Sequence, residues 1–272
     1  MSLLGMLKSK LLGGILTGDG DERVAFRCNI CGMQCRVERS AIGREIPSCK
    51  GCGSTVRMRA MIHCLSMELF GESKVIGDFP NDLHLRGVGM SDWVGYADRL
   101  AKKFEYTNTF YHQEPKLDIT DIDINMEGTL DFIISTDVFE HIAPPVSIAF
   151  ENTHRLLNEG GVFVFSVPYS LDSSPVAFEH FPDLHKYRIE QTENSFVLHN
   201  VTEKGEVQQF ENLIFHGGEG ATLEMRSFTL DSLYNEFQKA GFHDVRVHGE
   251  SFEEFGIYWD GGWSLPITAR AR

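Results

Sequence analysis

Long apolar runs are missing from this chain. No stretch of about eighteen uninterrupted apolar residues occurs, so we expect no membrane-spanning helix. The most apolar stretch, residues 3–16, is interrupted by Lys8, Lys10 and several glycines, and it lacks the small-residue cleavage site of a secretory signal. We therefore expect a frayed or amphipathic helix there, a Gly/Asp-rich link that completes a leader over residues 1–22, and a cytoplasmic protein.

Basic residues are also scarce. The sequence has 25 Lys and Arg residues against 39 Asp and Glu residues, which gives a net charge of −14. A field of this sign repels phosphate backbones, so nucleic acid is a disfavoured partner unless a basic patch is segregated from the rest. One basic cluster lies in the N-terminal quarter and keeps that interpretation open: Arg36, Arg39, Arg44, Lys50, Arg57 and Arg59.

Six cysteines are too few for a disulfide framework in a chain of 272 residues. Four of them form two C-x2-C-G units, at Cys28/Cys31 and Cys49/Cys52, which predict a reducing compartment and a metal. Four thiolates make a closed tetrahedral site that favours structural zinc and has no open position for catalysis. We expect a zinc knuckle over residues 23–56. Cys35 could replace one ligand.

The remainder, residues 57–272, alternates strand-like and helix-like segments, which predicts an α/β, Rossmann-like, doubly wound and mainly parallel sheet. An insertion at about 170–227, rich in His, Glu and Gly, interrupts the alternation. Strands are expected over 83–88, 105–110, 130–135, 161–168, 244–248 and 265–270. Helices are expected over 57–70, 92–103, 145–158 and 230–240, the last ending at Gly241.

Two adjoining motifs lie in the middle of this region. They read LDFIISTDVFEHI over 130–142 and HRLLNEGGVFVFSVP over 154–168. This stretch resembles class I S-adenosylmethionine-dependent methyltransferases of the type 11-like kind, and residues 228–247 resemble the ending of the same families. The resemblance covers most of residues 83–270 and implies a methyltransferase with S-adenosylmethionine as cofactor.

The resemblance also implies positions for the cofactor. In an open parallel sheet the ligand lies beyond the carboxyl ends of the strands, and glycines after the first strand allow close approach of the backbone. By resemblance, Asp118 accepts a hydrogen bond from the adenine amino group, and Ile119 lies against the ring. The residues expected at the cofactor are Gly87, Gly89, Ser91, Asn108, Asp118, Ile119, Thr136 and Asp137.

Three positions depart from the family pattern. Leu85 stands where the family usually has an acid, and Ser91 stands where it has a third glycine. The acid that holds the ribose is missing as well, and Asn108 or Thr109 is its expected replacement. These departures predict weaker contacts around the cofactor than the family pattern provides.

A hydroxyl acceptor needs a general base, and His141, with Glu140 beside it, is the first candidate because it follows the strand expected over 130–135. The alternative is that both residues only cap and pack the next helix. The insertion offers His180 and His216 as further candidates, in runs that mix aromatics, imidazoles and glycines as a substrate lid would.

The acceptor expected from these features is a small hydroxylated or sugar-like molecule, and the oligomeric state is open. Two other functions compete with this one. One is a non-catalytic, zinc-bearing interaction protein on a degenerate methyltransferase scaffold. The other is a nucleic-acid-modifying methyltransferase guided by the zinc knuckle and its arginines.

Overall fold

A six-stranded sheet forms the centre of the molecule. The computed structural model describes residues 23–193, 195–216 and 222–272, so the leader expected over 1–22 lies outside the described residues. The strand order is β15-β16-β6-β5-β3-β4; β4, β3, β5 and β6 are parallel, whereas β16 is antiparallel to both its neighbours. The strands are β3 (Asp82–Met90), β4 (Phe104–Thr109), β5 (Leu130–Thr136), β6 (Leu157–Ser166), β15 (His243–Val247) and β16 (Ile267–Arg270).

Each of these strands lies where the sequence predicts one, and the Rossmann-like, mainly parallel fold is confirmed. Each of the four expected helices is present, although α3 and α4 are shorter than predicted. They are α2 (Val56–Phe70), α3 (Val94–Leu100), α4 (Ser147–Leu156) and α5 (Leu230–Lys239). The predicted start and stop of α5 are also confirmed, because Thr229 and Ser232 form a capping box and Gly241 follows with φ +94°.

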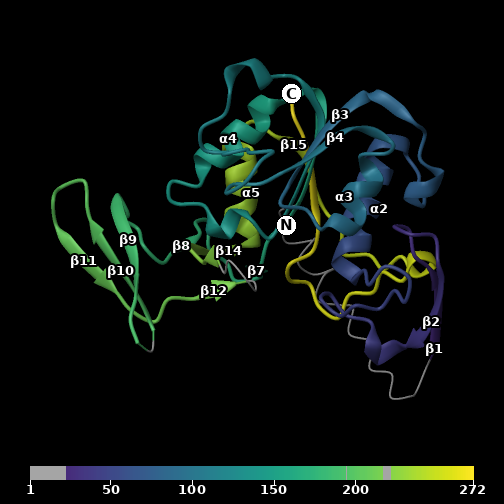
Figure 1. Cartoon of the computed structure of the whole chain (residues 1–272), viewed down its shortest axis with the longest axis horizontal. Coiled ribbons are helices and arrows are strands. Elements are labelled where there is room, and N and C mark those ends of the chain that lie inside the picture. The colour runs from purple at the N-terminus through teal and green to yellow at the C-terminus, as the bar shows by residue number, and fades with distance from the viewer. Residues whose placement is uncertain (1–22, 194, 217–221) are drawn as a thin grey trace.

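Helices cover both faces of the sheet (Figure 1). Alternation along β5 sends Phe132 and Ile134 to one face and Ile133 to the other. The first face packs against α2 and α3, and the second against α4 and α5, where a group of phenylalanines fills the core. The sheet is therefore packed on both faces, and this packing fixes the positions of the strand ends.

The cysteine-rich segment packs on the same face as α2 and α3. Its two strands, β1 (Arg23–Arg27) and β2 (Gln34–Glu38), form an antiparallel hairpin that the sequence analysis does not predict. Phe26 and Ile42 are buried in one continuous core with α2 and with the sheet residues Phe132 and Val162. The segment is therefore in direct contact with the sheet domain.

The insertion forms an antiparallel arm that projects away from the body, at the left of Figure 1. Leu198 of the arm is buried with Phe181, Leu223 and Met225, so the base of the arm has a small core of its own. The arm strands are β9 (Lys186–Gln191), β10 (Phe196–Val201) and β11 (Val207–Phe210).

Short elements complete the described chain. The short strands are β7 (Tyr169–Ser170), β8 (Phe178–Glu179), β12 (Phe215–His216), β13 (Thr222–Leu223) and β14 (Arg226–Thr229). The 3-10 turns are η1 (Arg39–Ala41), η2 (Ile76–Asp78), η3 (Ile124–Met126), η4 (Phe139–His141) and η5 (Glu253–Phe255). Within the described ranges, every helix is too short or too polar to cross a lipid bilayer.

Candidate active site and metal centre

The two glycines at the end of β3 lie against other groups of the protein. A Cβ on Gly87 would stand 2.2 Å from the Phe132 ring, and one on Gly89 would stand 2.0 Å from the Tyr106 hydroxyl and 2.2 Å from Asp92 Oδ2. Side chains at these positions would therefore displace the aromatic core and a buried carboxyl group. Ser91, which follows, has φ +57°, so the chain turns sharply here without a third glycine.

Asp92, whose carboxyl group lies against Gly89, is buried. The Tyr106 hydroxyl donates a hydrogen bond to Asp92 Oδ2 at 2.5 Å. Burial raises the pKa of Asp92 to about 7, against the opposing effect of that hydrogen bond. Asn108, the expected ribose partner, accepts a hydrogen bond from the Asp92 backbone N–H at 2.9 Å and donates one to its carbonyl at 2.8 Å. Its amide therefore fixes the backbone at Asp92.

The predicted adenine residues follow β4. Ile119 is buried, and its carbonyl accepts a hydrogen bond from Asn152 at 2.8 Å. Asp118 Oδ1 accepts hydrogen bonds from the backbone and the hydroxyl of Thr120, at 2.9 and 2.7 Å. These contacts hold the carboxylate in one orientation beside a buried apolar side chain.

Thr136 and Asp137, at the end of β5, meet Arg44 of the cysteine-rich segment and Arg57, the second residue of α2. Arg57 donates to Thr136 Oγ1 at 2.7 Å and lies 3.3 Å from Asp137. Arg44 contacts both carboxylate oxygens of Asp137, at 3.0 and 3.4 Å. Burial opposes the charge on Arg57, but hydrogen bonds to Glu45 and the charge of Asp137 outweigh it and raise the pKa of the guanidinium.

Glu140 and His141 lie in η4, directly after these residues. His141 Nδ1 lies 2.9 Å from the Leu223 carbonyl oxygen, and because a carbonyl can only accept, Nδ1 must donate. Nε2 of the neutral imidazole then carries the lone pair, and burial lowers the pKa of His141 despite this hydrogen bond. Glu140 is buried; burial, and next the charge of Asp137, raise the pKa of its carboxyl group to about 8.

A carboxylate from the insertion joins the predicted histidines. Glu224 accepts from His180 Nε2 at 2.8 Å and from His216 Nε2 at 2.5 Å. The His216 ring centre lies 5.6 Å from that of His141. Glu224 could not be singled out from the sequence, because its histidine partners lie 44 and 8 residues before it in the chain.

The four predicted metal ligands come together as one cluster. The Sγ atoms of Cys28, Cys31, Cys49 and Cys52 all lie within 4.8 Å of one another. Cys28 and Cys52 are 3.7 Å apart at sulfur, and Cys31 and Cys49 are 3.5 Å apart. A tetrahedral zinc site with Zn–S bonds of about 2.3 Å requires sulfurs about 3.8 Å apart, so the donor set fits zinc.

A buried cation lies beside this cluster. Arg59 is completely buried, and its guanidinium donates to Ser48 Oγ and to the carbonyl oxygens of Ser54 and Gly256. Within the described ranges it forms no ion pair with a carboxylate; burial lowers the pKa of its guanidinium, and negative charge on the neighbouring cysteine sulfurs would oppose that effect. Four thiolates around one divalent cation carry a net negative charge, which would compensate Arg59. Cys35 is a fifth cysteine close to the cluster, with its Sγ atom 3.7 Å from Cys49 Sγ.

The profile of a family described as "Methyltransferase domain" matches residues 83–247, which is more than half of the chain and includes Gly87, Gly89 and η4. The chain belongs to this methyltransferase family. No curated protein matches the sequence.

Solved structures similar to this methyltransferase have low sequence identity. An S-adenosylmethionine-dependent methyltransferase from Mesorhizobium loti is 16% identical, with a TM-score of 0.41 over 71% of this chain and 94% of that chain. An amino pentose methyltransferase from Micromonospora echinaspora is 12% identical, with a TM-score of 0.44 over 81% and 93%. A 1,6-didemethyltoxoflavin-N1-methyltransferase from Burkholderia thailandensis is 15% identical, with a TM-score of 0.41 over 79% and 77%.

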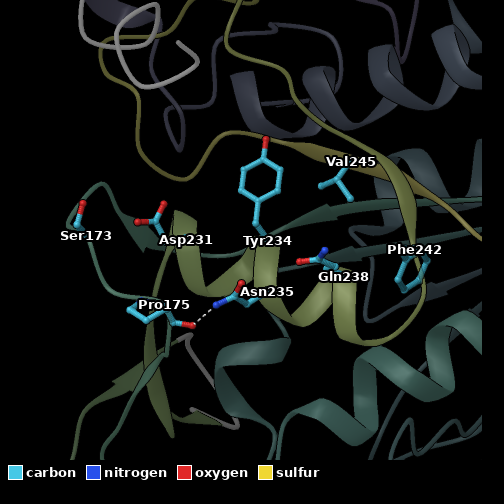
Figure 2. A pocket seen from close by; sticks show the side chains of 8 residues that line it. All are labelled: Ser173, Pro175, Asp231, Tyr234, Asn235, Gln238, Phe242 and Val245. Atoms are coloured by element: carbon cyan, nitrogen blue, oxygen red, sulfur yellow. Dashed lines mark hydrogen bonds between the residues drawn. The ribbon is translucent and has the colours of Figure 1, made fainter. Parts of the chain in front are cut away.

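Two surface pockets of about 550 Å³ each lie among the described residues of the methyltransferase. The first runs along α5, where Tyr234, Gln238 and Phe242 line it and Asn235 donates to the Pro175 carbonyl at 2.7 Å (Figure 2). It contains none of the predicted site residues. The second contains Tyr169, Ser170, Glu224, Phe228, Trp263 and Ser264, and lies beside the residues described above, because Arg44 donates to the Ser264 carbonyl at 3.1 Å.

Proposed function

We propose that the chain transfers a methyl group from S-adenosylmethionine to a small hydroxylated or sugar-like molecule. The observation that carries this proposal is that Gly87 and Gly89 at the end of β3 and Thr136 and Asp137 at the end of β5 lie at one edge of the sheet, within the span that matches the methyltransferase family. Ligands of open parallel sheets bind at this edge, beyond the carboxyl ends of the strands.

The residues present at this edge fit such a cofactor. Asp118 offers a carboxylate oxygen, Oδ2, that no hydrogen bond among the described residues uses, beside the buried Ile119. Glu140 Oε2 is likewise buried without a hydrogen-bond partner in the described part of the chain. When bound, S-adenosylmethionine supplies an activated methyl group, so the protein has to align the acceptor and remove its proton.

His141 would remove that proton through Nε2. Its Nδ1–H is already committed to the Leu223 carbonyl, which fixes both the tautomer and the ring orientation. Its lowered pKa leaves it neutral, and therefore basic, at pH 7. Glu140, with a pKa of about 8, keeps its own proton at that pH and would add no negative charge beside the base.

The second pocket supports a small acceptor. It combines the rings of Tyr169, Phe228 and Trp263 with hydroxyl groups and the Glu224 carboxylate, which suits a polyhydroxylated ring of limited size. The basic cluster of the sequence gives little support to a nucleic-acid substrate, because Arg44, Arg57 and Arg59 point into the protein and are largely buried or paired.

We further propose that the cysteine cluster binds one structural zinc ion. The sulfur geometry and the buried charge of Arg59 both support this assignment. All four donor positions are filled by protein, so such an ion would stabilise the segment and take no part in the transfer.

Replacing His141 tests the base. The His141→Ala variant should lose about 10²–10⁴-fold in turnover, the usual contribution of a positioned base, and keep its affinity for S-adenosylhomocysteine. Wild-type turnover should rise with pH through a midpoint below 6.5, since burial lowers the pKa of His141. A variant that loses stability but keeps its turnover per folded molecule would show that His141 only packs η4.

Glu140→Gln is the matched variant, because Gln keeps the shape of the protonated acid without its titration. Ionisation of Glu140 above pH 8 would place a carboxylate 3.7 Å from His141 Nε2, so wild-type turnover should change with pH in that range, and the Gln variant should not show this change. Acceptors for both assays come from a screen of nucleotide sugars and small hydroxylated metabolites. Equal high-pH profiles for the two proteins would exclude Glu140 from the reaction.

A further inference from the structure

The cysteine-rich segment and the first turn of α2 each supply one arginine to the edge of the sheet where the cofactor is proposed to bind. Arg44 and Arg57 both contact Asp137, and their side chains are only 14% and 16% exposed. Asp137 has φ +54°, a left-handed conformation that non-glycine residues rarely adopt. Its backbone N–H donates to the Ser166 carbonyl at 2.8 Å, and its carboxylate is held by the two guanidinium groups.

Backbone hydrogen bonds connect these arginines to each other and to the cysteine cluster. The Arg57 N–H donates to the Arg44 carbonyl at 3.2 Å, and the Val56 N–H donates to the Gly43 carbonyl at 3.4 Å. Cys52 lies five residues before Arg57, and the intervening Ser54 carbonyl accepts from the Ser48 and Cys49 N–H groups, at 3.1 and 3.2 Å.

The cysteine pairs also enclose the chain that carries Arg44. Cys28 and Cys31 lie at the turn between β1 and β2, whereas Cys49 and Cys52 lie in a second turn just before α2. Cross-linking the two turns closes the loop that contains Arg44, and a closed loop has fewer conformations than an open one. A metal at the four sulfurs would therefore restrict the position of this arginine.

We propose that the four-cysteine centre positions Arg44 and Arg57 against the end of β5. The two arginines would in turn fix the positions of Thr136 and Asp137 in the cofactor site. Arg44 and Arg57 are positioning residues in this account, and the proposal rests on the proposed function. Metal occupancy and cofactor affinity are then coupled through Arg44, although the sulfur cluster and the cofactor share no ligand.

A thermodynamic cycle tests this coupling. S-adenosylhomocysteine is titrated by calorimetry into wild type and Arg44→Ala, each loaded with zinc and each after removal of zinc with a chelator. We expect Arg44→Ala to weaken binding about tenfold in zinc-loaded protein, the size of one charge-assisted hydrogen bond. Zinc removal should weaken the wild type by a similar factor and the Arg44→Ala variant by no more than twofold.

Arg36→Ala is the matched control, because Arg36 lies in the same segment but is exposed, and it should bind as tightly as wild type. Circular dichroism establishes that the sheet stays folded without zinc. If the zinc-free protein unfolds, the Cys52→Ser variant takes the place of the zinc-free samples in the cycle, because it keeps three of the four thiolates. The proposal would be overturned if zinc removal weakened S-adenosylhomocysteine binding by the same factor in wild type and in Arg44→Ala. It would also be overturned if the zinc-free wild type bound as tightly as the zinc-loaded one.

Hydrogen exchange of the backbone supplies a readout that needs no ligand. Zinc removal and Arg44→Ala should each accelerate exchange over residues 134–138, and Arg36→Ala should not. Failure of zinc-loaded wild type to bind S-adenosylhomocysteine would count against the proposed function, but the exchange data would still test whether the cysteine centre positions the two arginines. Unchanged exchange over 134–138 after zinc removal would refute that positioning.

Discussion

Gly89→Ala is the substitution whose effect the structure predicts most directly. The added Cβ would stand 2.0 Å from the Tyr106 hydroxyl and 2.2 Å from Asp92 Oδ2, whereas carbon and oxygen atoms need more than 3 Å. Both groups are buried, so neither can move into solvent. The methyl group must therefore break the 2.5 Å hydrogen bond between Tyr106 and Asp92 or shift β3.

The magnitude follows from these two costs. Overpacking a close-packed interior costs about 1–3 kcal/mol, and a buried polar group that loses its partner costs about 1–3 kcal/mol more. We expect the free energy of unfolding to fall by about 3 kcal/mol, and Tm to fall by about 6–12 °C in a chain of this size. Binding of S-adenosylhomocysteine should weaken too, because the loop that follows Gly89 carries the proposed cofactor contacts.

Urea denaturation followed by circular dichroism measures this loss. Gly77→Ala is the control, since Gly77 is exposed and its added Cβ would meet no atom within 4 Å. Tyr106→Phe removes one of the two clashing oxygens, so the double variant should be more stable than the sum of the single effects predicts. A Gly89→Ala protein within 1 kcal/mol of wild type would refute the packing described for this loop.

Three further predictions concern the metal, the adenine site and the insertion. Purified wild type should contain close to one zinc per chain by elemental analysis, and Cys49→Ser should lose it; metal-free protein prepared without chelator would exclude the site. Asp118→Ala should weaken S-adenosylhomocysteine binding by about 1.5–3 kcal/mol in calorimetry, whereas Asp121→Ala should leave it unchanged; equal losses would place the adenine elsewhere. Glu224→Gln should lower kcat/KM for the acceptor about tenfold and keep the S-adenosylhomocysteine Kd within twofold, and an unchanged kcat/KM would remove Glu224 from the acceptor site.

The sheet and its helices could be predicted because each is recorded in local patterns. Apolar alternation, helical periodicity and the Thr229 and Gly241 end signals locate the elements to within a few residues. The cysteine cluster could be predicted for the same reason, since two short spacings specify it. Such signals lie within a single turn or strand, where the backbone fixes the geometry.

Contacts between distant segments could not be predicted in this way. The pairing of Arg44 with Asp137 joins residues 93 positions apart, and in the sequence both arginines belong to a basic cluster that predicts an exposed patch. The same holds for Glu224, whose partners come from opposite ends of the insertion, and for Asp92, which the sequence places at the start of an expected helix with no sign that it is buried against Tyr106. The charge and role of these groups depend on whether they are buried, and the burial of a polar residue cannot be read from a single sequence.

A crystal structure of the protein soaked with S-adenosylhomocysteine tests the central claim most directly. The account predicts density across the carboxyl ends of β4, β3 and β5, with the adenine beside Asp118 and Ile119 and the sulfur atom facing Thr136. Density in the pocket along α5, or an empty strand edge at a ligand concentration far above the micromolar range, would contradict it.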